Sequence, residues 1–270
     1  MTGLREFAKA NLRPLQVEEA GMDPKLARMP GIRAVVFDLY GTLLISAAGG
    51  IFGNAPDPEG LPGFEEVYWN LVREHHERRR AEGVAHPEVE VRDLWVESLR
   101  RLGKVVPASS ELEFSILAHE CRVNPVWPMP RAAETLSRLA GAGVSLGIIS
   151  NAQFYTLPVM EGLFGSSLEE LGFHPGLQVF SFEVGEGKPS PRLFEILGER
   201  AAGLGLDPSE VLYVGNDFRK DVLPARAIGF RTALFAGDAR SLRLGGLSED
   251  EARETADAVI TDLAQVAELF

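Results

Sequence analysis

Polar clusters that could carry out hydrolytic chemistry follow four apolar runs of the sequence. In chain order they contain Asp38, Tyr40 and Thr42, then Ser150 and Asn151, then Lys188, and finally Asn216, Asp217 and Asp221. A carboxylate can act as a nucleophile, because a covalent intermediate divides one difficult displacement into two easier ones. A nearby lysine would keep that carboxylate ionised and would neutralise charge on a transferred group. Hydroxyls and backbone N–H groups at helix starts would complete a cradle for an anion.

The acids at two of these positions also predict a metal. Two carboxylates at neighbouring strand ends repel each other unless a cation separates them, and a site of oxygen ligands suits Mg²⁺. Taken singly, each cluster has a structural explanation as well, because Ser-Asn and Asn-Asp pairs cap helices and Lys-Pro is common in turns. The occurrence of all four clusters in order at successive strand ends favours a common site.

A parallel sheet is predicted to position these clusters. Continuous apolar runs predict buried strands at 32–37, 144–150, 210–215 and 231–235, with weaker candidates at 178–182 and 258–263. Helices are predicted between them, as at 131–143 and 190–205, where glycines mark the ends. Strands that alternate with helices predict an α/β fold with a doubly wound parallel sheet. Such sheets bind ligands beyond the carboxyl ends of their strands.

The segment 50–127 interrupts this alternation. It contains three amphipathic stretches of helix length and no convincing strand, which predicts a helical insertion folded over the sheet. Gly- and Pro-rich stretches at 47–63 and 124–130 would serve as its hinges. The predicted organisation is an N-terminal extension (1–30), an α/β core (31–49 and 128–270) and a helical cap (50–127).

The composition limits the possible partners. The chain has 39 acidic and 27 basic residues and a net charge of -12, so nucleic acid and anionic membranes are not expected partners. The N-terminal stretch is charged where a signal peptide would be apolar, and no run approaches the ~20 apolar residues of a membrane span. We therefore expect a cytoplasmic protein whose small anionic substrate meets local positive groups. The oligomeric state stays open.

The ordered set DLYGT, ISN, GKPSP and GNDFRKD resembles the haloacid dehalogenase (HAD) superfamily of hydrolases, and the predicted cap resembles its helical C1-type cap. The likeness covers residues of about 32 to 270. It implies that Asp38 is the nucleophile and that Thr42 and Ser150 hold the transferred group. It also implies that Lys188 balances charge and that Asp217 binds Mg²⁺ together with Asp38 and the backbone carbonyl of Tyr40. Asn216 or Asp221 would then lie in or next to the ligand shell.

Tyr40 departs from the pattern of most phosphatases of this superfamily. They carry a second aspartate there as the acid and base, whereas tyrosine, with an ordinary pKa of about 10, is a poor base near neutral pH. DLYGT is the form seen in 2-haloacid dehalogenases. Those enzymes, however, use an arginine of the first cap helix, where this chain has Asn70 with Arg73 one turn later. They also carry a tyrosine where this chain has Phe194.

Three functions stay open at this point. A Mg²⁺-dependent hydrolase of a small phosphorylated metabolite leads, because a dehalogenase has no use for the acids of GNDFRKD. The others are a 2-haloacid dehalogenase and a binding or regulatory protein on a catalytically decayed HAD scaffold. Two basic stretches, REHHERRR at 73–80 and RSLRLGG at 240–246, are interpreted as a solvated helix face and a solvated loop.

Overall fold

The computed structural model describes residues 2–48 and 56–270. The strands are β1 (Ala34–Phe37), β2 (Leu44–Ser46), β3 (Val126–Pro128), β4 (Ser145–Ser150), β5 (Phe173–Phe180), β6 (Val211–Gly215), β7 (Arg231–Phe235) and β8 (Ala258–Ile260). The α-helices are α1 (Thr2–Asn11), α2 (Phe64–Ala81), α3 (Val91–Arg101), α4 (Ser109–Val123), α5 (Ala132–Gly141), α6 (Thr156–Phe164), α7 (Ser181–Val184), α8 (Arg192–Gly203), α9 (Leu223–Ala227) and α10 (Glu249–Thr255). Shorter helical turns are η1 (Pro208–Glu210), η2 (Phe218–Val222) and η3 (Leu263–Glu268).

The central sheet is parallel, with strand order β5-β4-β1-β6-β7-β8. The chain builds outward from β1 to β4 and β5, and then crosses to β6 on the other side of β1. The carboxyl end of β1 is therefore the point where the winding direction reverses, and such a point opens a crevice for ligands. The predicted doubly wound α/β fold is confirmed.

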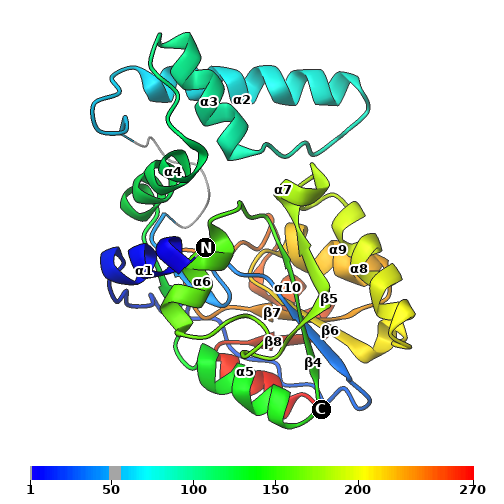
Figure 1. Cartoon of the computed structure of the whole chain (residues 1–270). Helices are drawn as coiled ribbons and strands as arrows, with labels where there is room; N and C mark the ends of the chain where they lie inside the picture. Colours follow the sequence, from blue (N-terminus) through cyan, green and yellow to red (C-terminus); the bar gives the residue numbers. More distant parts are fainter. Residues whose placement is uncertain (1, 49–55) are drawn as a thin grey trace.

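Helices cover both faces of this sheet (Figure 1). In β1, Val35 and Phe37 join the core beneath α5, α6 and η3, whereas Ala34 and Val36 join the core beneath α8. This alternation follows from the period of two in a strand. Both sets are fully buried, which explains why the predicted strand at 32–37 reads as an uninterrupted apolar run.

Two predicted strands differ in extent from the sequence-based expectation. The expected strand at 178–182 begins earlier, at Phe173, and ends at Phe180, where Ser181 opens the short helix α7 and its hydroxyl accepts the backbone N–H of Ala152 at 2.9 Å. The expected strand at 258–263 ends at Ile260, because Asp262 caps η3 by accepting the N–H of Ala264. In both places a polar side chain at the end of the strand accepts a hydrogen bond from a backbone N–H.

The helices α2, α3 and α4 lie together above the sheet (Figure 1). They leave and rejoin the core through β2 and β3, which pair antiparallel with each other outside the main sheet. Phe64 of α2 packs on Trp95 of α3 with ring centroids 4.6 Å apart, and both side chains are buried. Residues 49–55 of the predicted hinge at 47–63 lie outside the described part of the chain.

A second connection joins these helices to the core. The segment between α2 and α3 crosses the core loop before Lys188, where Gly187 N–H donates to the His86 carbonyl and Glu88 N–H donates to the Gly185 carbonyl. Gln153 of the core also donates to the Val89 carbonyl at 2.8 Å. The end of α2 is thereby held over the carboxyl edge of the sheet.

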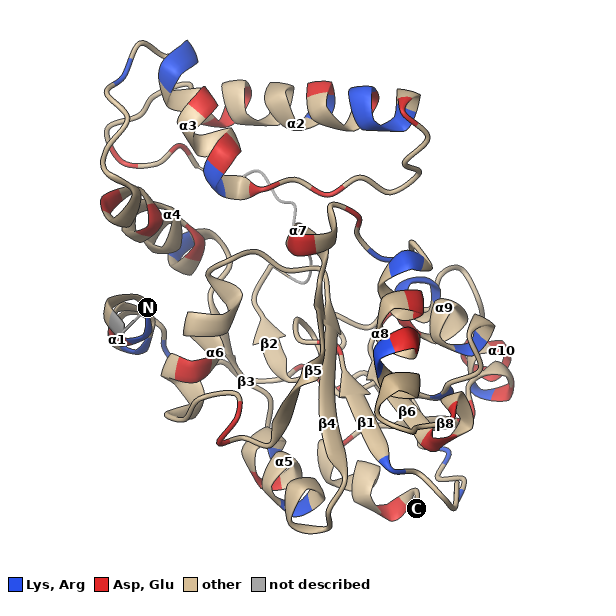
Figure 2. Ribbon diagram, turned by 45° about the vertical axis from the view of Figure 1, so that its right-hand side comes forward, with Lys and Arg blue, Asp and Glu red and all other residues tan. Residues whose placement is uncertain are grey.

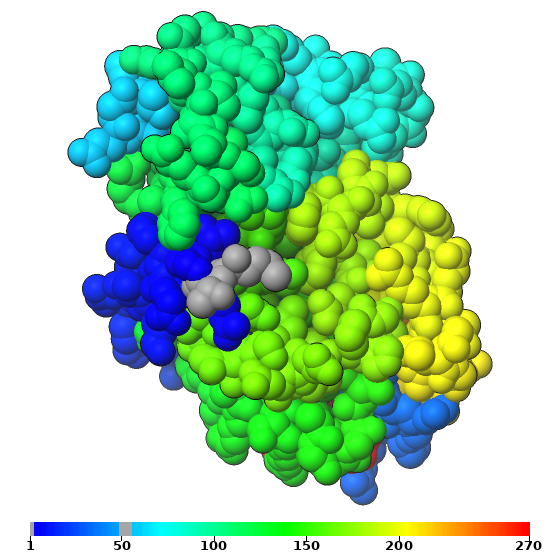
Figure 3. Space-filling view, viewed as in Figure 1, coloured from blue at the N-terminus to red at the C-terminus, as the bar shows by residue number. Residues whose placement is uncertain are grey.

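The N-terminal residues form part of the folded structure. Helix α1 packs against α6 and α4, and its blue atoms in Figure 3 lie beside the green atoms of both. The chain then runs to the far edge of the sheet, where Lys25 makes an antiparallel bridge with Val259 of β8. None of the helices in the described ranges is long and apolar enough to cross a membrane.

Candidate active site

Asp38 follows β1 directly and begins a tight turn. Its N–H still donates to the Val214 carbonyl of β6, so the side chain is fixed at the carboxyl edge of the sheet. Gly41 then adopts a φ of 85°, and a Cβ at this position would come within 2.6 Å of the Asn216 side chain. Glycine is needed here for both reasons, since other residues rarely adopt a positive φ.

One oxygen of the Asp38 carboxylate is held by two groups. Oδ1 accepts a hydrogen bond from Ser150 Oγ at 2.8 Å and forms an ion pair with Lys188 Nζ at 2.8 Å. Burial raises the pKa of the Asp38 carboxyl, and the Lys188 ammonium opposes this rise. Oδ2 has no hydrogen-bond partner among the described residues.

Lys188 lies between two acids. Besides Asp38, its Nζ contacts Asp221 Oδ1 at 2.6 Å. Burial alone would lower the pKa of Lys188, but Asp221 and Asp38 outweigh burial and raise it. Asn151 positions this lysine, because its Oδ1 accepts the Lys188 N–H at 2.7 Å and its Nδ2 donates to the Lys188 carbonyl.

Asp221 is fully buried, and both of its carboxylate oxygens are engaged. Oδ1 accepts from Lys188 and from the Tyr213 hydroxyl at 3.0 Å, while Oδ2 accepts from the Asp217 N–H at 2.9 Å. The carboxylate lies directly against Gly215, where a Cβ would come within 2.4 Å of it. Asp221 therefore holds the Lys188 ammonium in place.

Asp217 and Asn216 differ in how their side chains are used. Asp217 Oδ1 caps η2 by accepting the N–H groups of Arg219 and Lys220, whereas its Oδ2 has no partner in the described part of the chain. Asn216 Oδ1 accepts from Thr42 Oγ1 at 3.1 Å, and its Nδ2 donates to the Ser241 carbonyl. Asn216 thus ties the turn after β1 to the turn after β6.

The hydroxyl of Tyr40 bonds to α6 and not to Asp38. It shares a 2.9 Å hydrogen bond with Thr156 Oγ1 at the start of that helix. Burial, and then the Glu120 carboxylate, raise the pKa of the Tyr40 hydroxyl above its ordinary value. The phenol is therefore even less suited to act as a base near neutral pH than a free tyrosine.

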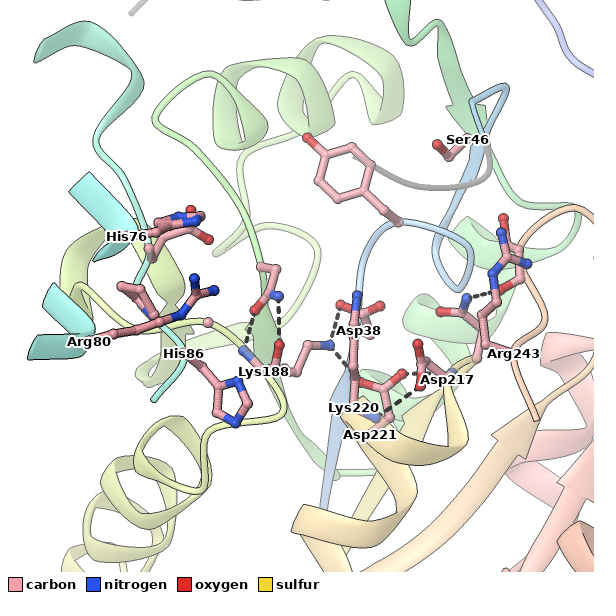
Figure 4. A pocket seen from close by; sticks show the side chains of 17 residues that line it. Asp38, Ser46, His76, Arg80, His86, Lys188, Asp217, Lys220, Asp221 and Arg243 are labelled. Atoms are coloured by element: carbon pink, nitrogen blue, oxygen red, sulfur yellow. Dashed lines mark hydrogen bonds and ion pairs between the residues drawn. The ribbon is translucent and has the colours of Figure 1, made fainter. Parts of the chain in front are cut away.

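These residues surround a pocket of about 440 Å³ (Figure 4). Of the residues predicted from sequence, the following line it: Asp38, Tyr40, Asn151, Lys188, Asn216, Asp217 and Asp221. Thr42 and Ser150 do not line it, but each hydrogen-bonds to a residue that does. The structure thus brings the four sequence clusters to one place.

Sequence reasoning missed several residues around this pocket. Tyr213, which reads as one apolar residue of a buried strand, donates its hydroxyl to Asp221. His76 and Arg80, interpreted as a solvated face, line the pocket, as does Arg243 of the expected solvated loop. The spacing of four between His76 and Arg80 places them on one helix face, but His75 and Arg79 have the same spacing, so no signal in the sequence distinguishes the pair that lines the pocket.

The donor set at this edge suits a hard cation. Asp38, Asp217 and Asp221 place three carboxyl groups at this edge, two of which contact the Lys188 ammonium. The described residues contain no cluster of three or more His, Cys, Asp or Glu side chains arranged to hold a metal. A cation here would therefore also need backbone, substrate and water oxygens, a combination that Mg²⁺ accepts.

The chain is similar in sequence to proteins named as phosphatases. A glyceraldehyde 3-phosphate phosphatase from Methanocaldococcus jannaschii is 30% identical over 156 residues, which cover 57% of this chain and 61% of that protein. A phosphoglycolate phosphatase from Pectobacterium atrosepticum is 28% identical over 216 residues, covering 77% and 81%. The chain spans 61% and 54% of the length of the two glyceraldehyde 3-phosphate phosphatases that it matches.

Solved structures support the fold. A crystal structure of a dehalogenase superimposes with a TM-score of 0.53 at 21% identity, covering 89% of this chain and 98% of that one. A HAD phosphatase from Thermococcus onnurineus gives 0.50 at 23% identity, covering 88% and 97%. The family pattern of haloacid dehalogenase-like hydrolases matches residues 32–229, most of the chain. This protein therefore belongs to the haloacid dehalogenase-like hydrolases.

Proposed function

We propose that the protein hydrolyses phosphate esters or anhydrides of small metabolites through an aspartyl intermediate on Asp38, with Mg²⁺ as cofactor. The observation that carries this proposal is the presence of Asp38 and Asp217 at one pocket, each with Oδ2 unpartnered among the described residues. Displacement of halide from a haloacid needs no second acid of this kind. Similarity to proteins named as phosphatases supports the same choice.

Asp38, Asp217 and the backbone carbonyl of Tyr40 would hold the ion. Bound there, Mg²⁺ would neutralise charge on the carboxylates and on the phosphoryl oxygens. Asn216 and Asp221 already use their side-chain atoms in bonds to the protein, so we place them behind the ligands as positioning residues.

The protein groups account for the first half of the proposed reaction. The Asp38 carboxylate attacks phosphorus, so that a new bond to its oxygen forms while the bond to the leaving oxygen breaks. Lys188 and Ser150 contact Asp38 Oδ1 and orient the carboxylate for this attack. Water then attacks phosphorus, so that the bond to the Asp38 oxygen breaks, the carboxylate is restored, and the proton of water leaves with the phosphate or to solvent. Because Tyr40 is a poor acid and base, leaving groups that need no proton should react best.

A 2-haloacid dehalogenase is the second candidate, and Tyr40 favours it. Two positions do not support it. Arg73 is exposed, bonds to Asn70 and is not among the residues that line the pocket. Phe194 is buried against Tyr213, with ring centroids 5.1 Å apart, and offers no hydroxyl.

Assays of phosphate release and of halide release distinguish the phosphatase from the 2-haloacid dehalogenase. We expect wild-type protein to release phosphate from p-nitrophenyl phosphate and acetyl phosphate with Mg²⁺ and to lose this activity with EDTA. Asp38→Asn should abolish turnover with the fold intact, whereas Asp250→Asn, an exposed change of the same chemistry, should not.

Melting curves provide a reading that does not depend on turnover. Added Mg²⁺ should raise the melting temperature of the wild-type protein by mass action, and Asp217→Ala should remove the rise. Halide release from 2-chloropropionate without Mg²⁺ would establish the dehalogenase instead. No release of either product and no effect of Mg²⁺ would point to the decayed scaffold.

A further inference from the structure

One wall of the pocket carries basic side chains that the proposed hydrolytic step does not use. His76 and Arg80 come from α2, His86 comes from the segment that follows, and Lys220 comes from the core. Figure 4 shows His76 and Arg80 on one side of Asp38, with Arg243 on the other side. Arg80 thus contributes a positive charge from α2 to the wall of the pocket that contains Asp38.

Helix geometry places His76 and Arg80 on the same face of α2, since they are four residues apart. The last turn of α2 is basic, and its blue ribbon is visible above the core in Figure 2. This end of the helix is held in place, because the His86 carbonyl accepts the N–H of Gly187, the residue before Lys188. Backbone hydrogen bonds thus join the pocket wall to the loop that precedes the catalytic lysine.

Arg80 differs from its two neighbours. Arg79 pairs with Glu82 at 2.6 Å, and Arg78 hydrogen-bonds to His75. The guanidinium of Arg80 has neither an ion pair nor a hydrogen bond to any described residue. Favourable interaction with the carboxyl end of the helix dipole explains basic residues in this turn. It does not explain why the arginine without a partner is the one that lines the pocket.

The charge balance of the pocket indicates a ligand for this group. Lys188 already contacts Asp38 and Asp221, and the cation proposed above would offset Asp217. The lining also contains one further acid, Glu88, and one further ammonium group, Lys220. Arg80 is therefore not needed to balance the acids of the pocket. Burial, and then Arg80, lower the pKa of His76, so its ring serves as a neutral hydrogen-bonding group. In a protein with a net charge of -12, an unpaired guanidinium in the pocket would draw anions to this wall.

We propose that Arg80, assisted by His76, binds a second anionic group of the substrate. The substrates would then be small phosphate esters or anhydrides whose leaving group carries a carboxylate or a second phosphoryl group. This inference rests on the proposed function and makes Arg80 a residue for specificity. An arginine suits the task because its planar fork binds either group through two hydrogen bonds.

Matched aryl phosphates test this inference, because their leaving groups need little help from an acid. Phenyl phosphate carries no second charge, 4-carboxyphenyl phosphate adds a carboxylate, and 4-phosphonophenyl phosphate adds a second phosphorus acid. We expect kcat/KM of the wild-type protein to be about 5- to 10-fold higher for at least one charged substrate than for phenyl phosphate, with the difference mainly in KM. Arg80→Gln should remove that preference by lowering kcat/KM for the charged substrate more than for phenyl phosphate.

Arg73→Gln is the matched control, since it makes the same change on the same helix outside the pocket lining. It should keep the preference. Equal kcat/KM for all three substrates, or a preference that survives Arg80→Gln, would overturn the inference.

Substrate binding can be measured in a variant that does not turn over, and this measurement tests the anion site independently of the proposed function. In the Asp38→Asn background, calorimetry should show tighter binding of a charged substrate than of phenyl phosphate, and Arg80→Gln should remove the difference. If no substrate is hydrolysed but this difference appears, the hydrolase proposal fails and the anion site stands. If all three bind equally, the anion site fails whatever the turnover.

Discussion

Replacing Asp221 by asparagine tests the network beneath the nucleophile. The buried carboxylate accepts from Lys188 and Tyr213 through Oδ1 and from the Asp217 N–H through Oδ2. Asparagine has nearly the same shape but only one acceptor oxygen. If that oxygen faces Lys188, the amide NH₂ meets the Asp217 N–H and two buried donors are left without acceptors. If the amide is flipped, its NH₂ meets the Lys188 ammonium, which is worse.

The loss in stability can be worked out from these contacts. A hydrogen bond to a charged group is worth about 1.5–3 kcal/mol, and an unsatisfied buried group costs about 1–3 kcal/mol. Removing one partner of a buried ion pair costs about 3–5 kcal/mol in comparable cases, although Lys188 here keeps Asp38. We therefore expect Asp221→Asn to lower the free energy of unfolding by about 3–4 kcal/mol.

Urea denaturation in EDTA at neutral pH measures this loss directly. The midpoint should fall while the slope with denaturant stays the same, because the surface exposed on unfolding does not change. Asp250→Asn, at an exposed position of α10, provides the control and should shift the midpoint little. A loss below about 1 kcal/mol for Asp221→Asn would refute the view that this carboxylate anchors Lys188.

Two further perturbations address the pocket and the helices above it. Tyr40→Asp should accelerate release from alkyl phosphates more than from aryl phosphates, approaching the roughly 10²- to 10⁴-fold that general acid-base help provides; equal effects on both classes would show that another group supplies the proton. Burial, and then Arg122, lower the pKa of His119 to about 4, and the neutral ring is satisfied because Nδ1 accepts from Arg122 and Nε2 donates to Glu65. Between pH 6.5 and 4 the unfolded chain therefore binds a proton at His119 that the folded chain does not, so stability should fall as pH is lowered through this range, by about 1–2 kcal/mol because the ring is partly exposed and its interactions are screened by solvent. His119→Gln should show a smaller fall in melting temperature over the same range, and an unchanged fall would refute this assignment.

Much of the core could be predicted from local pattern. The run that ends at Phe37 is apolar at successive positions, which indicates a strand buried on both faces of a sheet. Alternation with helices then limits the topology to a parallel, doubly wound arrangement, whose strand ends share one edge. For this reason Asp38, Lys188 and Asp217 could be expected at one site from residue order alone.

The contacts of individual side chains could not be predicted in the same way. Tyr213 contributes to an apolar strand pattern, and only the packing of β6 beside Lys188 and Asp221 gives its hydroxyl a role. Arg80 reads as one of three basic residues at a helix end, and nothing local distinguishes it from Arg79. The periodicity of a helix indicates which of its faces is apolar, but it does not indicate which residues of the protein lie opposite the polar face.

The sequence by itself therefore determined the family, the sheet and the set of acids at its edge, because these depend on burial pattern and on residue order. Only the tertiary structure decided which oxygens of those acids are already bonded and which cation of α2 faces the pocket. Such contacts join residues far apart in the chain, as between Lys188 and Asp38, and their geometry depends on how helices and sheet pack. That packing is a property of the whole fold, so no local stretch of sequence contains it.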